Sequence, residues 1–93
     1  MIVRWTHKAQ QDLARVYNFA LQHSRRRANK VADRLTTATD GLQFAPYIGI
    51  HLEQYEPDEV RKLVIDDYEI HYQIVESENR IYIVDLWHVR EDR

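Results

Sequence analysis

The sequence predicts an α+β fold: an N-terminal strand and an antiparallel helix hairpin packed on a small, mostly antiparallel β-sheet, in the order β-α-α-β-β-β. Three observations predict it. Apolar residues recur at helical spacing in two consecutive segments of the first half. Apolar and polar residues alternate through most of the last third, which is typical of strands with one buried face. Short polar breaks separate those strands, so they can follow one another as a meander.

The first half of the chain is expected to hold one strand and both helices. Met1–Trp5 is a short apolar run that favours a strand, and Thr6 is expected to cap the first helix. That helix should run from about His7 to about Gln22, where the polar segment 23–27 breaks it. A second apolar stripe follows so closely that the two helices should form a hairpin. The residues of the two stripes are Ala9, Leu13, Val16, Tyr17 and Ala20, then Ala28, Val31, Leu35, Ala38 and Leu42.

The second half is expected to supply the rest of the sheet. Pro46 disfavours α conformation at Ala45, so the second helix should end within residues 44–46. His51–Tyr55 is expected to form a short edge strand. Residues 60–75 should form a hairpin around a tight turn at Asp66 and Asp67, and a looser turn leads to the last strand, residues 81–90. The residues expected mostly in the core are Leu13, Val16, Leu35, Leu42, Ile70, Tyr72, Ile83 and Leu86.

Length and composition narrow the class of protein. A chain of 93 residues allows a single domain over residues 1–93. It has no cysteine, and therefore neither a disulfide framework nor thiolate chemistry. There is no apolar run long enough to span a bilayer and no signal-peptide pattern at Met1, so a cytoplasmic protein without a membrane partner is expected. The net charge of −2 argues against a protein that grips an extended nucleic acid, which usually shows a basic excess.

Four segments of the chain, taken in order, resemble the motifs of one known family. Residues 5–13 carry A-x-x-D-L at the start of the first helix, and residues 42–49 carry L-x-x-x-P-x-x-G at the end of the second. Residues 60–72 resemble the hairpin R-x-L-x-x-x-x-Y-R-I-x-Y, and residues 83–90 end in H-x-R. Together they resemble the RelE/ParE toxin superfamily over nearly the whole chain. The resemblance implies the toxin of a bacterial type II toxin–antitoxin (plasmid stabilisation) system, bound by a cognate antitoxin protein and forming oligomers through it.

The superfamily contains two activities, so the activity of this chain has to be inferred from its site residues and not from its fold. RelE-like members cut messenger RNA on the ribosome, whereas ParE-like members poison DNA gyrase without catalysis. Cleavage needs a base, an acid and cations over the developing phosphorane charge. If the chain were a ribonuclease, His88, Arg90 and Lys62 would be the candidates. However, Glu69 occupies the position of the arginine in the hairpin motif, several acidic residues share the same strands, and the net charge is close to neutral. These departures favour a ParE-like gyrase inhibitor over an enzyme.

In the ParE-like interpretation the cationic and aromatic residues of the strands serve as recognition groups for gyrase. The expected target-binding residues are Arg61, Lys62, Trp87, His88 and Arg90. Two alternatives stay open: a RelE-like endoribonuclease acting on the ribosome and messenger RNA, and an inactive superfamily member that acts as a co-repressor with its antitoxin. No cofactor is expected. No metal site is expected either, because the five histidines lack paired ligand spacing and no cysteine joins them.

Several candidate residues also have simpler structural interpretations. His88 has about equal chances of being a strand-end histidine bonded to backbone and of being a functional group. His71 is expected to be exposed, and Arg25–Arg27 is expected to be a solvated turn between the helices rather than a nucleic-acid patch. Arg61 and Glu69 could form a cross-strand ion pair worth about 0–1 kcal/mol if exposed. Trp5 and Trp87 are expected to be core or rim aromatics.

Overall fold

The computed structural model describes residues 1–91, and within them the chain forms two helices and a sheet of five strands. Three short 3-10 turns, η1 (Gly41–Gln43), η2 (Glu53–Tyr55) and η3 (Glu76–Glu78), connect them. The main elements are β1 (Ile2–Trp5), α1 (His7–Leu21), α2 (Arg25–Asp40), β2 (Ile50–His51), β3 (Glu59–Ile65), β4 (Tyr68–Val75) and β5 (Arg80–His88).

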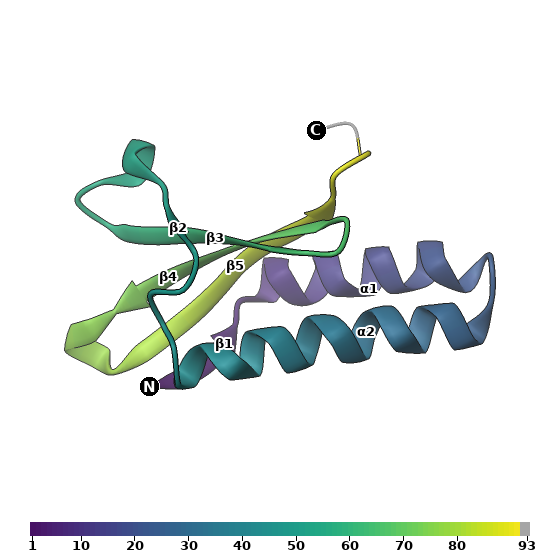
Figure 1. Ribbon diagram of the computed structural model, residues 1–93, viewed down its shortest axis with the longest axis horizontal. Coiled ribbons are helices and arrows are strands. Elements are labelled where there is room, and N and C mark those ends of the chain that lie inside the picture. Colours follow the sequence, from purple (N-terminus) through teal and green to yellow (C-terminus); the bar gives the residue numbers. More distant parts are fainter. Residues whose placement is uncertain (92–93) are drawn as a thin grey trace.

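The strands lie in the order β1-β5-β4-β3-β2, with β1 parallel to β5 and every other pair antiparallel. The two helices run side by side beneath one face of this sheet and extend beyond its end (Figure 1). Among residues 1–91 no α-helix covers the other face, which we call the open face; only η2 reaches it, where Tyr55 meets the ring of His71. The predicted α+β class and the helix hairpin are confirmed.

Side-chain caps explain where the helices begin. The Thr6 hydroxyl accepts a hydrogen bond from the Ala9 N–H at 3.1 Å, as predicted, and Ser24 accepts one from the Arg27 N–H at 3.0 Å. Since Ser24 caps α2, the expectation that Arg25–Arg27 forms a turn between the helices is wrong: these exposed arginines form the first turn of α2. The second helix also ends earlier than predicted, at Asp40, and η1 continues the chain to the loop before β2.

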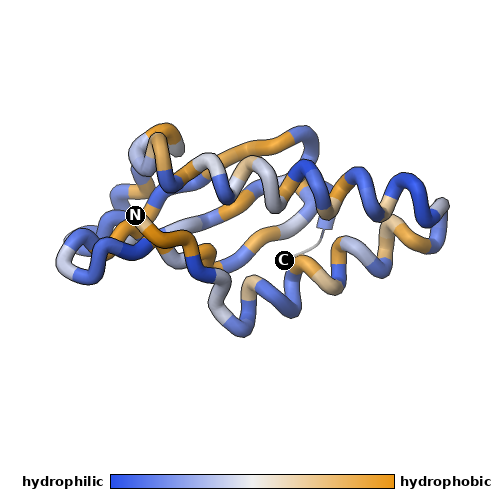
Figure 2. Tube along the Cα trace, turned by 90° about the horizontal axis from the view of Figure 1, so that it is seen from below, coloured by the Kyte–Doolittle hydropathy of each residue, from blue (hydrophilic) through white to orange (hydrophobic). Residues whose placement is uncertain are grey.

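The core lies between the helix hairpin and the covered face of the sheet. Of the eight residues predicted for it, all but Leu13 are buried, and Leu13 is partly buried against the cluster. Ala9, Ile74 and Ile81 complete its centre, and Trp5 packs at its rim. Hydrophobic and hydrophilic positions alternate along both helices, as expected of elements that bury one side (Figure 2).

The register decides which side chains share a face. In β4, Tyr68, Ile70 and Tyr72 lie on the helix side, while Glu69 and His71 lie on the open face.

The pairing of β4 with β5 is interrupted once. His71 is opposite Asp85, but Tyr72 is opposite Ile83, so Val84 is the extra residue of a β-bulge. Beyond the bulge, Leu86 and His88 are on the helix side and Trp87 is on the open face. The bulge thus exchanges the two faces in the last third of β5.

The connections between strands were predicted in part. The tight turn at Asp66–Asp67 is confirmed, and Asp66 adopts a φ of 53°, a left-handed conformation that aspartate tolerates better than most residues. The expected edge strand His51–Tyr55 is instead the two-residue β2 followed by η2. Within residues 1–91, neither helix is long and apolar enough to cross a membrane.

Candidate functional site

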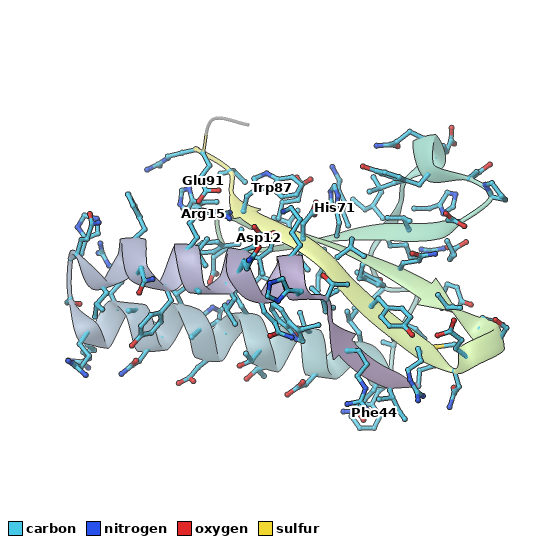
Figure 3. All side chains as sticks on the ribbon, turned by 180° about the vertical axis from the view of Figure 1, so that it is seen from behind. Asp12, Arg15, Phe44, His71, Trp87 and Glu91 are labelled. Carbon is cyan, nitrogen blue, oxygen red and sulfur yellow. The ribbon has the colours of Figure 1, made fainter. Side chains whose placement is uncertain are left out.

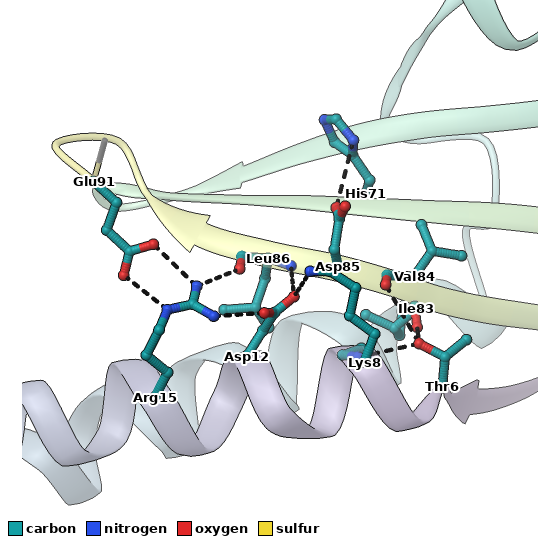
Figure 4. Close-up of polar contacts among 11 residues, drawn as sticks. Thr6, Lys8, Asp12, Arg15, His71, Ile83, Val84, Asp85, Leu86 and Glu91 are labelled. Atoms are coloured by element: carbon teal, nitrogen blue, oxygen red, sulfur yellow. Dashed lines mark hydrogen bonds and ion pairs between the residues drawn. The ribbon is translucent and has the colours of Figure 1, made fainter. Parts of the chain in front are cut away.

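Side chains of α1 and of its N-cap, Thr6, bond to the backbone along the edge of β5. The strand β1 accompanies β5 only as far as Ile83. Beyond that point the Thr6 hydroxyl bonds to the Ile83 carbonyl at 3.0 Å, and Asp12 accepts from the Leu86 N–H at 3.1 Å (Figure 4). Arg15 donates to the Leu86 carbonyl at 3.1 Å. An unpaired strand edge exposes its backbone polar groups. Beyond the end of β1, these side chains therefore supply the hydrogen bonds that a neighbouring strand would otherwise make.

Asp12 is the centre of this contact between α1 and β5. Its carboxylate is buried and also accepts from Lys8 at 2.7 Å and from Arg15 at 2.5 Å. Burial alone would raise the pKa of Asp12, but the hydrogen bonds from Lys8, Arg15 and the Leu86 N–H together hold that pKa below its usual value. The A-x-x-D-L motif thus has a structural role: Ala9, which is fully buried, allows close approach, and Asp12 anchors the strand.

A second network holds the loop before β2 in place. The Tyr72 hydroxyl donates to the Pro46 carbonyl at 2.7 Å and accepts from the Gly49 N–H at 2.9 Å. Arg61 donates to the carbonyls of Tyr47 and Gly49, at 3.0 and 2.7 Å. These bonds hold the loop in place. They explain the spacing of proline and glycine in the motif and the arginine that follows in β3.

Arg61 makes further local contacts. Its Nε bonds to Glu59 at 2.7 Å, and its guanidinium lies 5.0 Å from the centre of the Tyr47 ring. The predicted ion pair between Arg61 and Glu69 is wrong, because Arg61 is opposite Tyr72 on the helix side and Glu69 lies on the open face.

The open face of the sheet presents a cluster around His71. Its Nε2 is 2.8 Å from Glu69, its Nδ1 is 3.6 Å from Asp85, and its ring meets Trp87 edge-on at 4.6 Å (Figure 3). Lys62 is opposite His71 in β3. The expectation that His71 is exposed is wrong: only 12% of its side chain is accessible, because its strand neighbours and Tyr55 of η2 enclose it, the rings of Tyr55 and His71 being 6.4 Å apart.

His88 lies on the helix side, at the end of β5. Its ring meets Tyr68 edge-on at 5.1 Å, and its Nδ1 accepts a hydrogen bond from the Arg90 N–H at 3.1 Å. The backbone-bonded interpretation of His88 is confirmed, and the bond places the ring proton on Nε2, which is 3.9 Å from Asp67. Burial raises the pKa of Tyr68, with Asp67 adding to the effect and Arg27 opposing it.

A groove of about 750 Å³ opens beside His88, where the helix hairpin extends past the sheet. We call it the hairpin-end groove. The end of α1, the start of α2, the β3–β4 turn and the end of β5 contribute to it. Its principal lining residues are Phe19, Arg27, Val31, Tyr68, His88 and Arg90.

The predicted target-binding residues therefore lie in three places. Arg61 holds the loop before β2, Lys62 and Trp87 lie on the open face, and His88 and Arg90 border the hairpin-end groove. Arg90 follows the end of β5 and is not part of the sheet. The sequence reasoning missed Phe19 and Arg27. The available signal was Phe19 itself, a large aromatic residue outside the apolar stripe of its helix.

No site for a metal ion is built into the part of the chain that the structure describes. Among residues 1–91 no three histidine or carboxylate side chains are grouped to hold one.

These features define a small α+β protein in which a helix hairpin covers one face of a five-stranded sheet, and comparison with known proteins finds the same fold. The structure is similar to a chain of the chromosomal ParDE toxin–antitoxin system from P. aeruginosa, with a TM-score of 0.76, 21% identity and 95% of each chain covered. At that identity the likeness shows the fold. Residues 3–93 match the family described as the ParE toxin of the type II toxin–antitoxin system parDE. No curated protein matches the sequence.

The chain therefore belongs to the ParE toxin family and is the toxin of a type II toxin–antitoxin system. The resemblance to the RelE/ParE superfamily, and to its ParE-like members in particular, is confirmed.

Proposed function

We propose that this toxin inhibits DNA gyrase in the cytoplasm by contact rather than by chemistry, and that a cognate antitoxin neutralises it. The observation that carries the proposal is the dispersal of the residues a ribonuclease would need. Lys62 and His88 lie on opposite faces of the sheet. General acid–base cleavage of RNA requires those groups to converge on one phosphate, so their separation supports a non-enzymatic toxin.

The individual groups are also poorly disposed for catalysis. The Nε and Nη1 of Arg61 already bond to Glu59 and to two carbonyls, so a phosphate would have to compete with these contacts. Glu69 occupies the place of the motif's arginine and bonds to His71. The Nδ1 of His88 already accepts a backbone N–H.

Two assays on the purified toxin test the proposal directly. We expect inhibition of DNA supercoiling by reconstituted gyrase and no ribosome-dependent cleavage of messenger RNA in a translation extract. If gyrase is unaffected while ribosome-bound messenger is cut, the protein is a RelE-like enzyme. Absence of growth arrest on expression without the antitoxin would instead favour the inactive co-repressor.

A substitution at His88 separates recognition from catalysis. Glutamine keeps a hydrogen-bonding side chain of similar size but cannot titrate near neutral pH. For His88→Gln we expect modest attenuation of gyrase inhibition. A proton-transfer residue would instead lose about two to four orders of magnitude in rate. Loss of toxicity of that size, with antitoxin binding intact, would contradict the proposal.

The antitoxin part of the proposal is supported by exposed apolar surface. Phe44, Ile48 and Ile50, around the loop before β2, are largely exposed, and among residues 1–91 neither α1 nor α2 covers the open face of the sheet. A short antitoxin segment that folds on the toxin would cover such surface. We expect a dissociation constant in the nanomolar range or below, as an order of magnitude. No association between the toxin and the product of the adjacent small gene would contradict this.

A further inference from the structure

We infer that this toxin binds its protein target through the hairpin-end groove. The groove accepts a segment of the target that carries an apolar side chain flanked by carboxylates. The inference rests on the proposed inhibition by contact. It adds Phe19 and Arg27, from the helix hairpin, to the predicted binding residues His88 and Arg90.

The floor of the groove is apolar and accessible. Phe19 is 62% exposed although it is a large aromatic residue, and its ring meets His23 edge-on at 5.8 Å. Val31 and Tyr68 line the same groove. Among residues 1–91 the Tyr68 hydroxyl has no hydrogen-bond partner, so it is available to a ligand. Exposed aromatic residues beside a groove are typical anchors of protein interfaces.

The rim of the groove carries uncompensated positive charge. Within residues 1–91 the guanidinium groups of Arg27 and Arg90 form no ion pair, whereas Arg15, Arg34 and Arg61 are each bound to carboxylates. Local positive charge on a chain of net charge −2 favours an acidic partner.

Two of the three acidic residues that line the groove are bound by arginines that do not line it. Both oxygens of Asp66 are held by Arg34, at 2.5 and 3.0 Å. Glu91 is held by Arg15 through both of its oxygens, at 3.3 and 3.0 Å. Asp67 lies 3.9 Å from the His88 ring. Carboxylates of a partner would therefore meet Arg27 and Arg90 without displacing an existing ion pair.

A protein segment fits this surface better than a nucleic acid. A phosphate backbone that followed the groove would pass Asp66, Asp67 and Glu91, and the protein has no basic excess to offset that repulsion. An apolar side chain between two carboxylates has partners for each of its parts: Phe19 and Tyr68 for the apolar group, and Arg27 and Arg90 for the charges.

The test compares exposed groove residues with matched residues elsewhere. Phe19→Ala, Arg27→Glu and Arg90→Glu should each weaken growth arrest by about tenfold or more, while Arg27→Lys retains most of it. Antitoxin affinity should stay within about threefold of the wild-type value. Ile2→Ala and Arg4→Glu are the controls: both residues lie in β1, outside the groove, where Ile2 is 43% exposed and Arg4 is also exposed. Both controls should leave growth arrest unchanged.

Circular dichroism and thermal unfolding of each variant establish that it is folded, which the exposure of these side chains leads us to expect. As a second measurement, the backbone amides of isotopically labelled toxin are followed while the gyrase A subunit or the B subunit is added. Shifts at residues 19, 27, 68 and 88, absent in Arg27→Glu, are expected.

Three results would overturn the inference. The first is full growth arrest by the folded groove variants. The second is parallel loss of antitoxin binding, which would assign the groove to the antitoxin. The third is binding of a DNA duplex that Arg27→Glu abolishes. If the wild type arrests growth but does not inhibit supercoiling, the gyrase proposal fails, whereas the growth-arrest comparison still decides on the groove.

Discussion

At the scale of single residues, Asp12 links a sequence motif to the fold. Its buried carboxylate accepts a hydrogen bond from the Leu86 N–H, on a stretch of β5 that has no neighbouring strand. Removing it leaves that N–H and the Lys8 charge without their partner, and leaves Arg15 with Glu91 as its one carboxylate. Removing one partner of a buried, hydrogen-bonded ion pair is among the single substitutions that reduce the free energy of unfolding most.

We expect Asp12→Ala to reduce the free energy of unfolding by about 3 kcal/mol. The control Asp33→Ala, on the exposed side of α2, should change it by no more than about 0.5 kcal/mol. Chemical denaturation measures both. Equal, small changes in the two variants would show that Asp12 does not anchor β5.

The same residue predicts a pH dependence. Because the pKa of Asp12 is lower in the folded chain than its unfolded value of about 3.9, its contribution is present above that value and is lost as the pH falls through the folded pKa. Denaturation between about pH 5 and pH 2 should therefore show a steeper loss of stability in the wild type than in Asp12→Ala. Parallel curves would contradict this.

The two glycines give a matched pair of substitutions. A Cβ on Gly49 would lie 2.7 Å from both the Lys62 carbonyl oxygen and the Tyr72 hydroxyl, whereas one on Gly41 would meet nothing within 4 Å. Gly49→Ala should destabilise the protein by about 1–3 kcal/mol. Gly41→Ala, at a helical backbone conformation, should stabilise it by about 0.4–1 kcal/mol. Thermal unfolding distinguishes the signs, and a tolerated Gly49→Ala would contradict the tight approach.

At the scale of elements, the segment between β2 and β3 is held by a histidine between two carboxylates. The His51 Nε2 is 2.6 Å from Glu56 and its Nδ1 is 3.2 Å from Glu59. A neutral ring has one N–H and can donate only one of these bonds, so the arrangement favours the imidazolium. The hydrogen bond to Glu56 is the main reason that the pKa of His51 is raised.

This arrangement predicts the titration of His51. Its pKa should lie above the ordinary value of about 6.5, and Glu56→Gln should lower it. Because the folded pKa is raised, the contribution of His51 to stability is fully present below about pH 6.5 and is lost as the pH rises through the folded pKa. The ring proton signals of His51 in the two proteins provide the measurement. An unchanged titration in Glu56→Gln would show that the contact to Glu56 does not hold the segment.

At the scale of the whole molecule, the sheet has one covered face, one open face and unequal edges. β4 lies between β3 and β5 and faces the core, while β2 is a two-residue edge strand. Local opening should therefore cost far less at β2 than at the centre of the sheet. In hydrogen exchange, we expect the amides of Ile70 and Tyr72 to approach the global unfolding limit. The amides of η2 should exchange with little protection. Uniform protection across the sheet would contradict this gradient.

Most of the helices, strands and core residues could be predicted from patterns of residues close in sequence. The Thr6 cap, the apolar stripes and the alternation in β4 predict the helices, the hairpin at Asp66–Asp67 and most of the core, because each depends on residues close in sequence. The ordered motifs pointed to the toxin family for the same reason: Ala9 and Asp12 sit one helical turn apart on a face that must meet β5.

The site depended on the tertiary structure. Counting by two from Ile83 would place Trp87 on the helix side and His88 on the open face, and the bulge at Val84 reverses both. The local sign of the bulge was that two apolar residues, Ile83 and Leu86, are three positions apart, where an unbroken strand would space them by an even number. Burial of His71 and the presence of Phe19 and His88 in one groove depend on packing between distant segments. Local periodicity carries no information about such packing, so the sequence by itself determined the elements, and only the tertiary structure decided which side chains share a surface.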